Sequence, residues 1–207
     1  MRYVHSHGEI LAVRSSLIAR VGAFKGISRD VQRYLDVVLN PKNQLYIDRI
    51  SIEHDPEYKQ IVGYVVLRHK GEVFQFRRGP ASVESRLHSK LAIAVGGHIC
   101  KVQDAAYQDV YHETYRENLR QEFLGKVRLS TAYQDSIVAV INDEDDFVVG
   151  RFHFGIVHIY DLLEPHVEVL VEGMIEPGFV PISSIRSNWD QYERWSQLVA
   201  QEILAIT

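Results

Sequence analysis

Apolar and polar positions in the first part of the chain have the spacing of a helix. Apolar residues recur three or four apart at Val31, Leu35, Val38 and Leu39. This spacing predicts a helix over residues 28–39 with one buried face, with Ser28 as its N-cap and Asn40-Pro41 as its stop. Residues 1–50 are therefore expected to form an N-terminal extension with a helix, ahead of a domain over residues 51–207.

The rest of the chain has mostly the spacing of strands. Residues 60–68 form a nearly continuous apolar run rich in β-branched side chains, residues 69–72 have turn composition and residues 73–77 alternate, so a β-hairpin is expected. A strand at 91–95, a turn at Gly96-Gly97 and a helix form the central predicted unit. The other predictions are strands at 136–141, 152–160 and 167–173, and helices at 107–124 and 189–206.

This order of elements predicts an α/β sandwich, in which helices cover a mixed sheet. The last helix has aromatic and apolar residues three and four apart, which indicates a face that docks against the sheet: Trp189, Tyr192, Trp195 and Val199. The acidic run at residues 143–146 lacks the spacing of a calcium-binding loop and is expected to be a solvated turn.

The composition limits which classes of protein are expected. Hydrophobic residues at 46% and charged residues at 24% are typical of a soluble globular protein, and 207 residues suffice for a sizeable core. A net charge of -4 makes nucleic acid an unexpected partner. The single cysteine, Cys100, excludes an internal disulfide and is interpreted as a small, partly buried residue. With neither a signal peptide nor a long apolar segment in view, we expect a cytoplasmic protein without a membrane span.

Several separated motifs resemble the Nudix hydrolase superfamily over about residues 45–200. Their order is a strand at residues 63–67, then residues 76–79, then Gly96-Gly97-His98-Ile99, and then a helix with Arg116-Glu117 and Gln121-Glu122. Three further segments resemble a bacterial Nudix-like subfamily of predicted phosphoesterases: residues 55–61, 84–88 and 150–155. The resemblance implies a Nudix-type α/β/α sandwich with a mixed sheet, and a phosphoanhydride hydrolase that uses Mg²⁺ or Mn²⁺.

The helix that would bind the metal departs from the family pattern. With Leu119 at the apolar position of the motif, Asn118 and Gln121 occupy positions where the family has glutamate, and Glu122 remains as an acid. In this register Asp109 falls at the earlier glutamate and Leu124 replaces a glycine. A register anchored on Arg116-Glu117 retains that dipeptide but loses the glutamate pair.

The resemblance implies a set of metal and catalytic residues on this helix. Glu122, Glu117 and Glu113 are the expected metal ligands, because carboxylate oxygens suit Mg²⁺ and Mn²⁺. Glu122, Gln121 and Glu117 are the expected catalytic residues. Glu113 and Glu117 are four apart and share a helix face, whereas Glu117 and Glu122 are separated by about 140° around the helix.

Glycines and basic residues outside the helix are the expected substrate-binding set. Gly96 and Gly97 permit both a tight turn and a close backbone approach to a ligand. His98 can donate a hydrogen bond to phosphate or hold a proton near neutral pH. Arginine forms forked hydrogen bonds to phosphate oxygens, and the candidates for that role are Arg77, Arg78 and Arg86.

Three functions remain open from the sequence. One is a divergent Nudix-type hydrolase that cleaves a diphosphate linkage in a nucleoside diphosphate derivative. A second is a catalytically degenerate module that senses a nucleotide or binds a protein, because Asn118 and Gln121 supply no negative charge to a metal. A third is an interaction protein that assembles, for instance as a homodimer, through residues 1–50. A nucleotide-type small molecule is the expected partner.

Overall fold

The computed structural model describes residues 8–82, 84–101, 111–145 and 150–205, with the side chains of 111–114 outside the description. The chain forms two compact units, each built from separate segments of the sequence. Unit 1 contains the described residues up to Gly63 together with residues 96–123 and 139–156, and unit 2 contains the remainder. The expected boundary at residue 50 stays a prediction, and unit 1 continues past it.

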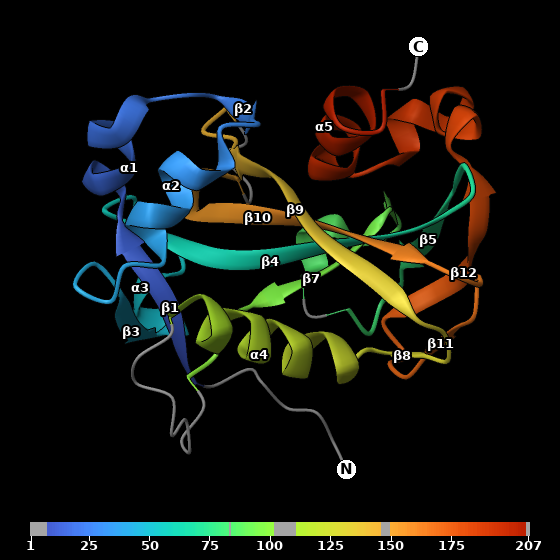
Figure 1. The fold of residues 1–207 in the computed structure, drawn as a ribbon, viewed down its shortest axis with the longest axis horizontal. Helices are drawn as coiled ribbons and strands as arrows, with labels where there is room; N and C mark the ends of the chain where they lie inside the picture. The colour runs from blue at the N-terminus through green and yellow to red at the C-terminus, as the bar shows by residue number, and fades with distance from the viewer. Residues whose placement is uncertain (1–7, 83, 102–110, 146–149, 206–207) are drawn as a thin grey trace. The chain divides into compact units, whose positions relative to one another are not determined.

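Unit 1 combines one part of the sheet with four helices (Figure 1). Its own elements are β1 (Glu9–Arg14), α1 (Ser15–Gly22), β2 (Gly26–Ser28), α2 (Val31–Val38), β3 (Leu45–Asp48), α3 (Arg49–Ile52), α4 (Tyr111–Leu124) and the 3₁₀ turn η2 (Gly150–Phe152). Four strands have residues in both units: β4 (Tyr58–His69), β7 (Ala94–His98), β9 (Tyr133–Asn142) and β10 (His153–Leu162). In unit 1 the strand order is β2-β9-β10-β4, and β1 pairs with both β3 and β4.

Unit 2 is built around the predicted hairpin. Its own elements are β5 (Glu72–Arg78), the 3₁₀ turn η1 (Ser85–Leu87), β6 (Leu91–Ala92), β8 (Val127–Leu129), β11 (Val167–Val169), β12 (Met174–Pro181), the 3₁₀ segment η3 (Ile182–Gln191) and α5 (Arg194–Glu202). Its strand order is β12-β5-β4-β10-β9, and β8 pairs with β11 in a second, two-stranded sheet. The hairpin prediction is confirmed, with antiparallel pairing of Arg68 with Val73 across the turn.

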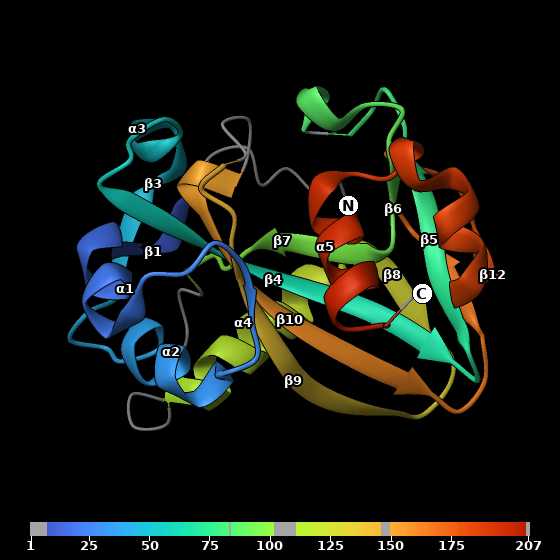
Figure 2. The same cartoon turned by 90° about the horizontal axis from the view of Figure 1, so that it is seen from above.

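Each unit has an apolar core of its own. In unit 1, α1 and α2 lie side by side, and the rings of Phe24 and Tyr34 pack with centroids 4.8 Å apart (Figures 1 and 2). Phe154 on β10 completes this cluster, 6.2 Å from Tyr34. In unit 2 the docking face predicted for the last helix is confirmed, because Trp195 and Val199 are buried. The ring of Trp195 meets that of Tyr64 edge to face.

Two local predictions were wrong. The first helix begins at Val31 rather than at residue 28, and Ser28 ends strand β2 instead of capping the helix. Its hydroxyl oxygen does accept a hydrogen bond from the Asp30 backbone, at 3.2 Å. Gly96-Gly97 is not a turn: both residues lie inside β7, which runs on to His98.

Other differences lie where short elements have weak sequence signals. The predicted last helix is split between η3 and α5, and a strand that the sequence analysis did not predict, β12, forms at Met174–Pro181. Asp143 in the predicted solvated turn is buried. In the described part of the chain, none of the helices has the length and apolarity needed to cross a membrane.

Candidate functional site

Helix α4 packs closely on strand β4 because a glycine lies at the contact. The buried face of α4 has residues three and four apart: Tyr115, Asn118, Leu119 and Phe123. A Cβ atom placed on Gly63 would lie 2.1 Å from Cδ1 of Leu119. Only glycine therefore permits this approach of helix to strand, and that approach fixes where the next helical turn falls.

The carboxylate of Glu122 lies directly on the backbone of Gly97. A Cβ atom at Gly97 would be 2.3 Å from Oε1 and 2.5 Å from Cγ of Glu122. Both residues are half-buried. The structure thus brings together two residues of the predicted site, and the close approach expected of Gly97 is present although the expected turn is not.

His98 follows Gly97 in β7 and contacts a second histidine, His153, on β10. The Nε2 atoms of His98 and His153 are 3.1 Å apart, so one imidazole donates to the other. His153 is buried at the start of β10, whereas His98 is half-buried. His153 was missed as a functional candidate, although it lies in the segment 150–155 that resembles the Nudix-like subfamily. We name Gly97 and Glu122 the glycine-glutamate site. Successive residues of a strand point to opposite faces, so the side chain of His98 lies on the other face of β7 from Glu122, and a role of His98 in substrate binding stays a prediction.

Glu117 and Gln121 lie on the exposed face of α4. Both oxygens of Glu117 accept from Arg120, at 2.8 Å each, and Nε2 of Gln121 donates to Glu117 at 2.7 Å. These hydrogen bonds, that from Arg120 first, lower the pKa of Glu117 from 4.5 to about 2. A catalytic or metal-binding role of Glu117 and Gln121 stays a prediction.

The lowered pKa predicts a small pH dependence of stability. Because the pKa of Glu117 is lower in the folded chain than in the unfolded one, the ionised carboxylate stabilises the fold above pH 4.5, and this contribution is lost as the pH falls towards about 2. The effect is expected to be small, since the Glu117 side chain is 51% exposed. Urea midpoints of the wild type and of Glu117→Gln should differ slightly at pH 6 and converge near pH 2. A gap that stays constant over this range would contradict the pairing.

Oxygen donors for a divalent cation are present at the glycine-glutamate site. The carboxylate of Glu122 occupies the space that a side chain at position 97 would fill. Carboxylate oxygens are suitable ligands for Mg²⁺ or Mn²⁺. In the described part of the chain, no group of three or more His, Cys, Asp or Glu side chains converges on one point. Two further candidates, the side chain of Glu113 and the whole of Asp109, lie outside the described residues.

The three candidate arginines belong to unit 2, and each has a carboxylate partner there. Arg77 donates to Glu176 at 2.8 Å, and Arg86 forms a forked pair with Glu84 at 2.6 Å for both contacts. Arg78 forms a forked pair with the buried Glu193, considered in the Discussion. Phosphate binding by these arginines stays a prediction.

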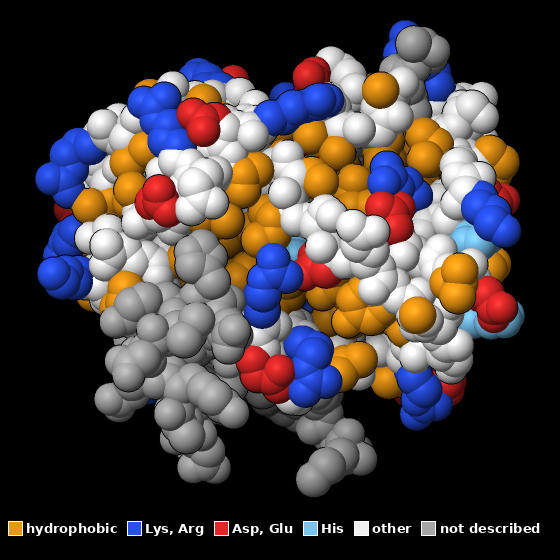
Figure 3. Space-filling model, in the orientation of Figure 1, with side chains coloured by type: hydrophobic (Ala, Val, Ile, Leu, Met, Phe, Trp, Pro, Cys, Tyr) orange, Lys and Arg blue, Asp and Glu red, His pale blue; other side chains and the backbone are white. Residues whose placement is uncertain are grey.

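Charged side chains on the surface are mixed in sign. On the face drawn in Figure 3, basic and acidic side chains are interspersed over the described residues. Ion pairs link exposed side chains of opposite charge, for instance Lys101 with Glu9 at 2.9 Å and Lys25 with Asp145 at 2.7 Å. The described part of this face therefore has no broad basic area of the kind that attracts a polyanion.

The chain is similar in sequence to one known protein. The chain is 32% identical over 156 residues to protein YmaB of Bacillus subtilis (strain 168), covering 73% of this chain and 74% of YmaB. No protein-family model matches the chain.

The chain is also similar in fold to solved structures. Tm1382, a proposed Nudix hydrolase, superposes with a TM-score of 0.77 at 22% identity, over 95% of this chain and 98% of its own. DR0079 from Deinococcus radiodurans has a TM-score of 0.51 at 13% identity, over 77% of this chain and 90% of its own. The predicted mixed α/β fold of Nudix type is confirmed. The chain belongs to the family of YmaB and has the fold of the Nudix hydrolases.

Proposed function

We propose that the protein is a Nudix-type hydrolase that cleaves a diphosphate linkage in a nucleoside diphosphate derivative with a divalent metal. The observation that carries the proposal is the carboxylate of Glu122 lying on the backbone of Gly97. This arrangement presents a carboxylate beside a half-buried strand backbone that carries no side chain, both within unit 1. A polar, partly enclosed surface of this kind suits the binding of a charged phosphate group.

The residues named in the proposal have separate roles. Glu122 would hold Mg²⁺ or Mn²⁺, with the backbone at Gly97 leaving room beside it. When bound, such a cation neutralises diphosphate charge and lowers the pKa of a coordinated water. His98 donates a hydrogen bond to a phosphate oxygen or holds a proton, and its contact with His153 fixes the orientation of its ring.

Replacing Glu122 by glutamine is expected to lower hydrolysis at least about 100-fold, which corresponds to about 2.7 kcal/mol of transition-state stabilisation. The amide retains the shape of the side chain but loses its charge. The measurement is release of phosphate or nucleotide from a broad panel of nucleoside diphosphate derivatives with Mg²⁺ or Mn²⁺. Glu168→Gln, an exposed acid of unit 2, is the matched control and should retain full activity.

A negative result on the wild type would be decisive as well. If the folded protein released no product from any member of the panel with either metal, the hydrolase proposal would fail. A Glu122→Gln variant as active as the wild type would remove Glu122 from the mechanism.

A second function is favoured by Asn118 and Gln121. Asn118 is buried on the packed face of α4, and Gln121 donates to Glu117, so neither places an acid beside Glu122. A module that binds a nucleotide without cleaving it is consistent with this loss of charge. Retained binding of a nucleoside diphosphate to a protein without turnover would support this alternative.

A further inference from the structure

Two glycines on paired strands face helix α4 in unit 1. A Cβ atom on Gly63 of β4 would lie 2.1 Å from Cδ1 of Leu119. A Cβ atom on Gly97 of β7 would lie 2.5 Å from Cγ of Glu122. Strand β7 pairs with β4, so the sheet presents two neighbouring positions without side chains to the same helix.

The two contacts are less than one helical turn apart. Leu119 and Glu122 are three residues apart, which corresponds to a rise of about 4.5 Å along the helix. Backbone hydrogen bonds hold such a short stretch of helix together, so it moves as one body. A displacement of Leu119 away from β4 would therefore also move Glu122 away from β7.

The two contacts differ in how easily they can yield. Leu119 is 2% exposed and Gly63 is buried, so the branch of the leucine has no free space into which it can rotate. Glu122 is half-buried, and its side chain can turn towards solvent. A side chain at position 63 is therefore expected to move the helix, whereas a side chain at position 97 would move the glutamate side chain.

We propose that Gly63 is a positioning residue for Glu122. The branch of Leu119 enters the space that a side chain at position 63 would fill, and this sets the depth at which α4 packs on the sheet. That depth places the Glu122 carboxylate on the backbone of Gly97. The consequence for hydrolysis rests on the proposed function, whereas the position of Glu122 can be measured without a substrate.

Gly63→Ala is expected to move Glu122 away from Gly97. The measurement is the NMR resonance of the Gly97 backbone amide, which should shift in the same direction as in Glu122→Ala, because a charged group leaves this backbone in both variants. Hydrolysis should fall at least about tenfold, since a misplacement of about 1 Å can cost about 100-fold. An unchanged Gly97 resonance in folded Gly63→Ala would overturn the proposal.

Leu119→Val provides a rescue that separates positioning from packing. Valine lacks Cδ atoms, so the double variant Gly63→Ala with Leu119→Val adds one carbon to the strand and removes one from the helix, which conserves volume. The Gly97 resonance and most of the hydrolysis should return. Recovery of thermal stability without recovery of the resonance would reduce Gly63 to a packing role and overturn the proposal. If Gly63→Ala alone does not fold, the resonance of the double variant still decides.

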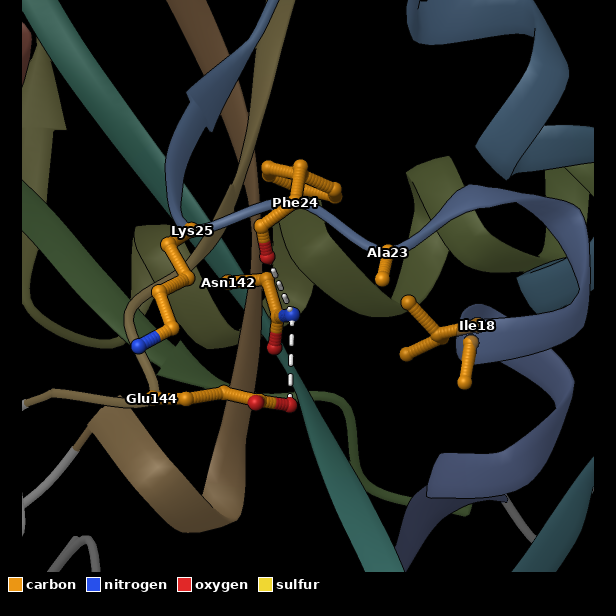
Figure 4. Close-up of a pocket in the computed structure, with 7 residues that line it drawn as sticks. Ile18, Ala23, Phe24, Lys25, Asn142 and Glu144 are labelled. Atoms are coloured by element: carbon orange, nitrogen blue, oxygen red, sulfur yellow. Dashed lines mark hydrogen bonds between the residues drawn. The ribbon is translucent and has the colours of Figure 1, made fainter.

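Two control variants add side-chain volume away from α4. Gly178→Ala makes the same substitution where a Cβ would meet no atom within 4 Å. Ala19→Leu enlarges an exposed residue of unit 1 that lines a cavity of about 360 Å³ between α1 and the end of β9 (Figure 4). The described lining of this cavity contains no residue of α4, β4 or β7. Both controls should retain the wild-type resonance and activity, and a comparable shift in either would contradict a specific link between Gly63 and Glu122.

The two measurements distinguish this proposal from the proposed function. If the wild type and all variants release no product, the proposed hydrolysis fails. The Gly97 resonance of the same proteins then still shows whether Gly63 positions Glu122.

Discussion

Replacing Glu193 by alanine is expected to lower the free energy of unfolding by about 3–5 kcal/mol, because it leaves a buried guanidinium without its counter-charge. Glu193 accepts from Nε of Arg78 at 2.5 Å and from its terminal nitrogen at 3.1 Å, and the side chains are 4% and 18% exposed. Burial opposes the charge of Arg78, yet the charge and hydrogen bonds of Glu193 raise the pKa of the guanidinium overall.

The same carboxylate is part of a wider buried network in unit 2. The hydroxyl group of Tyr64 lies 3.2 Å from Oε1 of Glu193 and 2.9 Å from Oγ of Ser196. Ser196 in turn accepts from the backbone N–H of Ile93 at 3.1 Å. These bonds join the start of α5 to β4 and to Ile93, which follows β6, so removal of Glu193 leaves several groups unsatisfied together.

The stability of two further variants distinguishes this buried network from an exposed ion pair. Glu176→Ala removes the partner of Arg77, but Glu176 is 64% exposed, so a change of at most about 1 kcal/mol is expected. The double change Arg78→Met and Glu193→Leu removes both charges and should recover much of the lost stability. Urea unfolding followed by circular dichroism gives each value. A Glu193→Ala variant no less stable than Glu176→Ala would contradict a structural role of the pair.

The elements that the sequence predicted well have strong, local signals. The β4–β5 hairpin follows from two β-rich runs around a Lys70-Gly71 turn, and α2 follows from its apolar spacing. The failures lie where a distant partner decides the conformation. Gly96-Gly97 was interpreted as a turn, but tertiary contact with α4 holds these residues in strand β7.

In the candidate site too, some residues could be predicted from the sequence and others could not. The resemblance to Nudix proteins singled out Gly97 and Glu122, and the structure brings them into contact. His153 lies 55 residues from His98, and only the folded chain shows their contact. The prediction for Arg78 was drawn from its residue type alone, which cannot reveal a buried glutamate 115 residues away. A single sequence therefore does not show which charged residues form a pair when they lie far apart along the chain.

Replacing Gly97 by alanine is expected to lower hydrolysis about 100-fold while leaving the fold intact. The new Cβ would collide with both the carboxylate and Cγ of Glu122, so the half-buried side chain has to turn away as a whole. A displacement of about 1 Å is enough to cost about 100-fold in a reaction that depends on position. Activity and thermal unfolding of the variant test this, with Gly178→Ala as control, since a Cβ there would meet no atom within 4 Å.

The double variant of Gly97→Ala with Glu122→Gln decides whether the two residues act together. If the alanine acts only by displacing the carboxylate, it has nothing further to remove once Glu122 has lost its charge, so the double variant should be about as active as Glu122→Gln alone. Multiplied losses, about 10⁴-fold in total, would mean that Gly97 acts independently of Glu122. Non-additivity would therefore tie the proposed activity to the contact between β7 and α4, rather than to either residue alone.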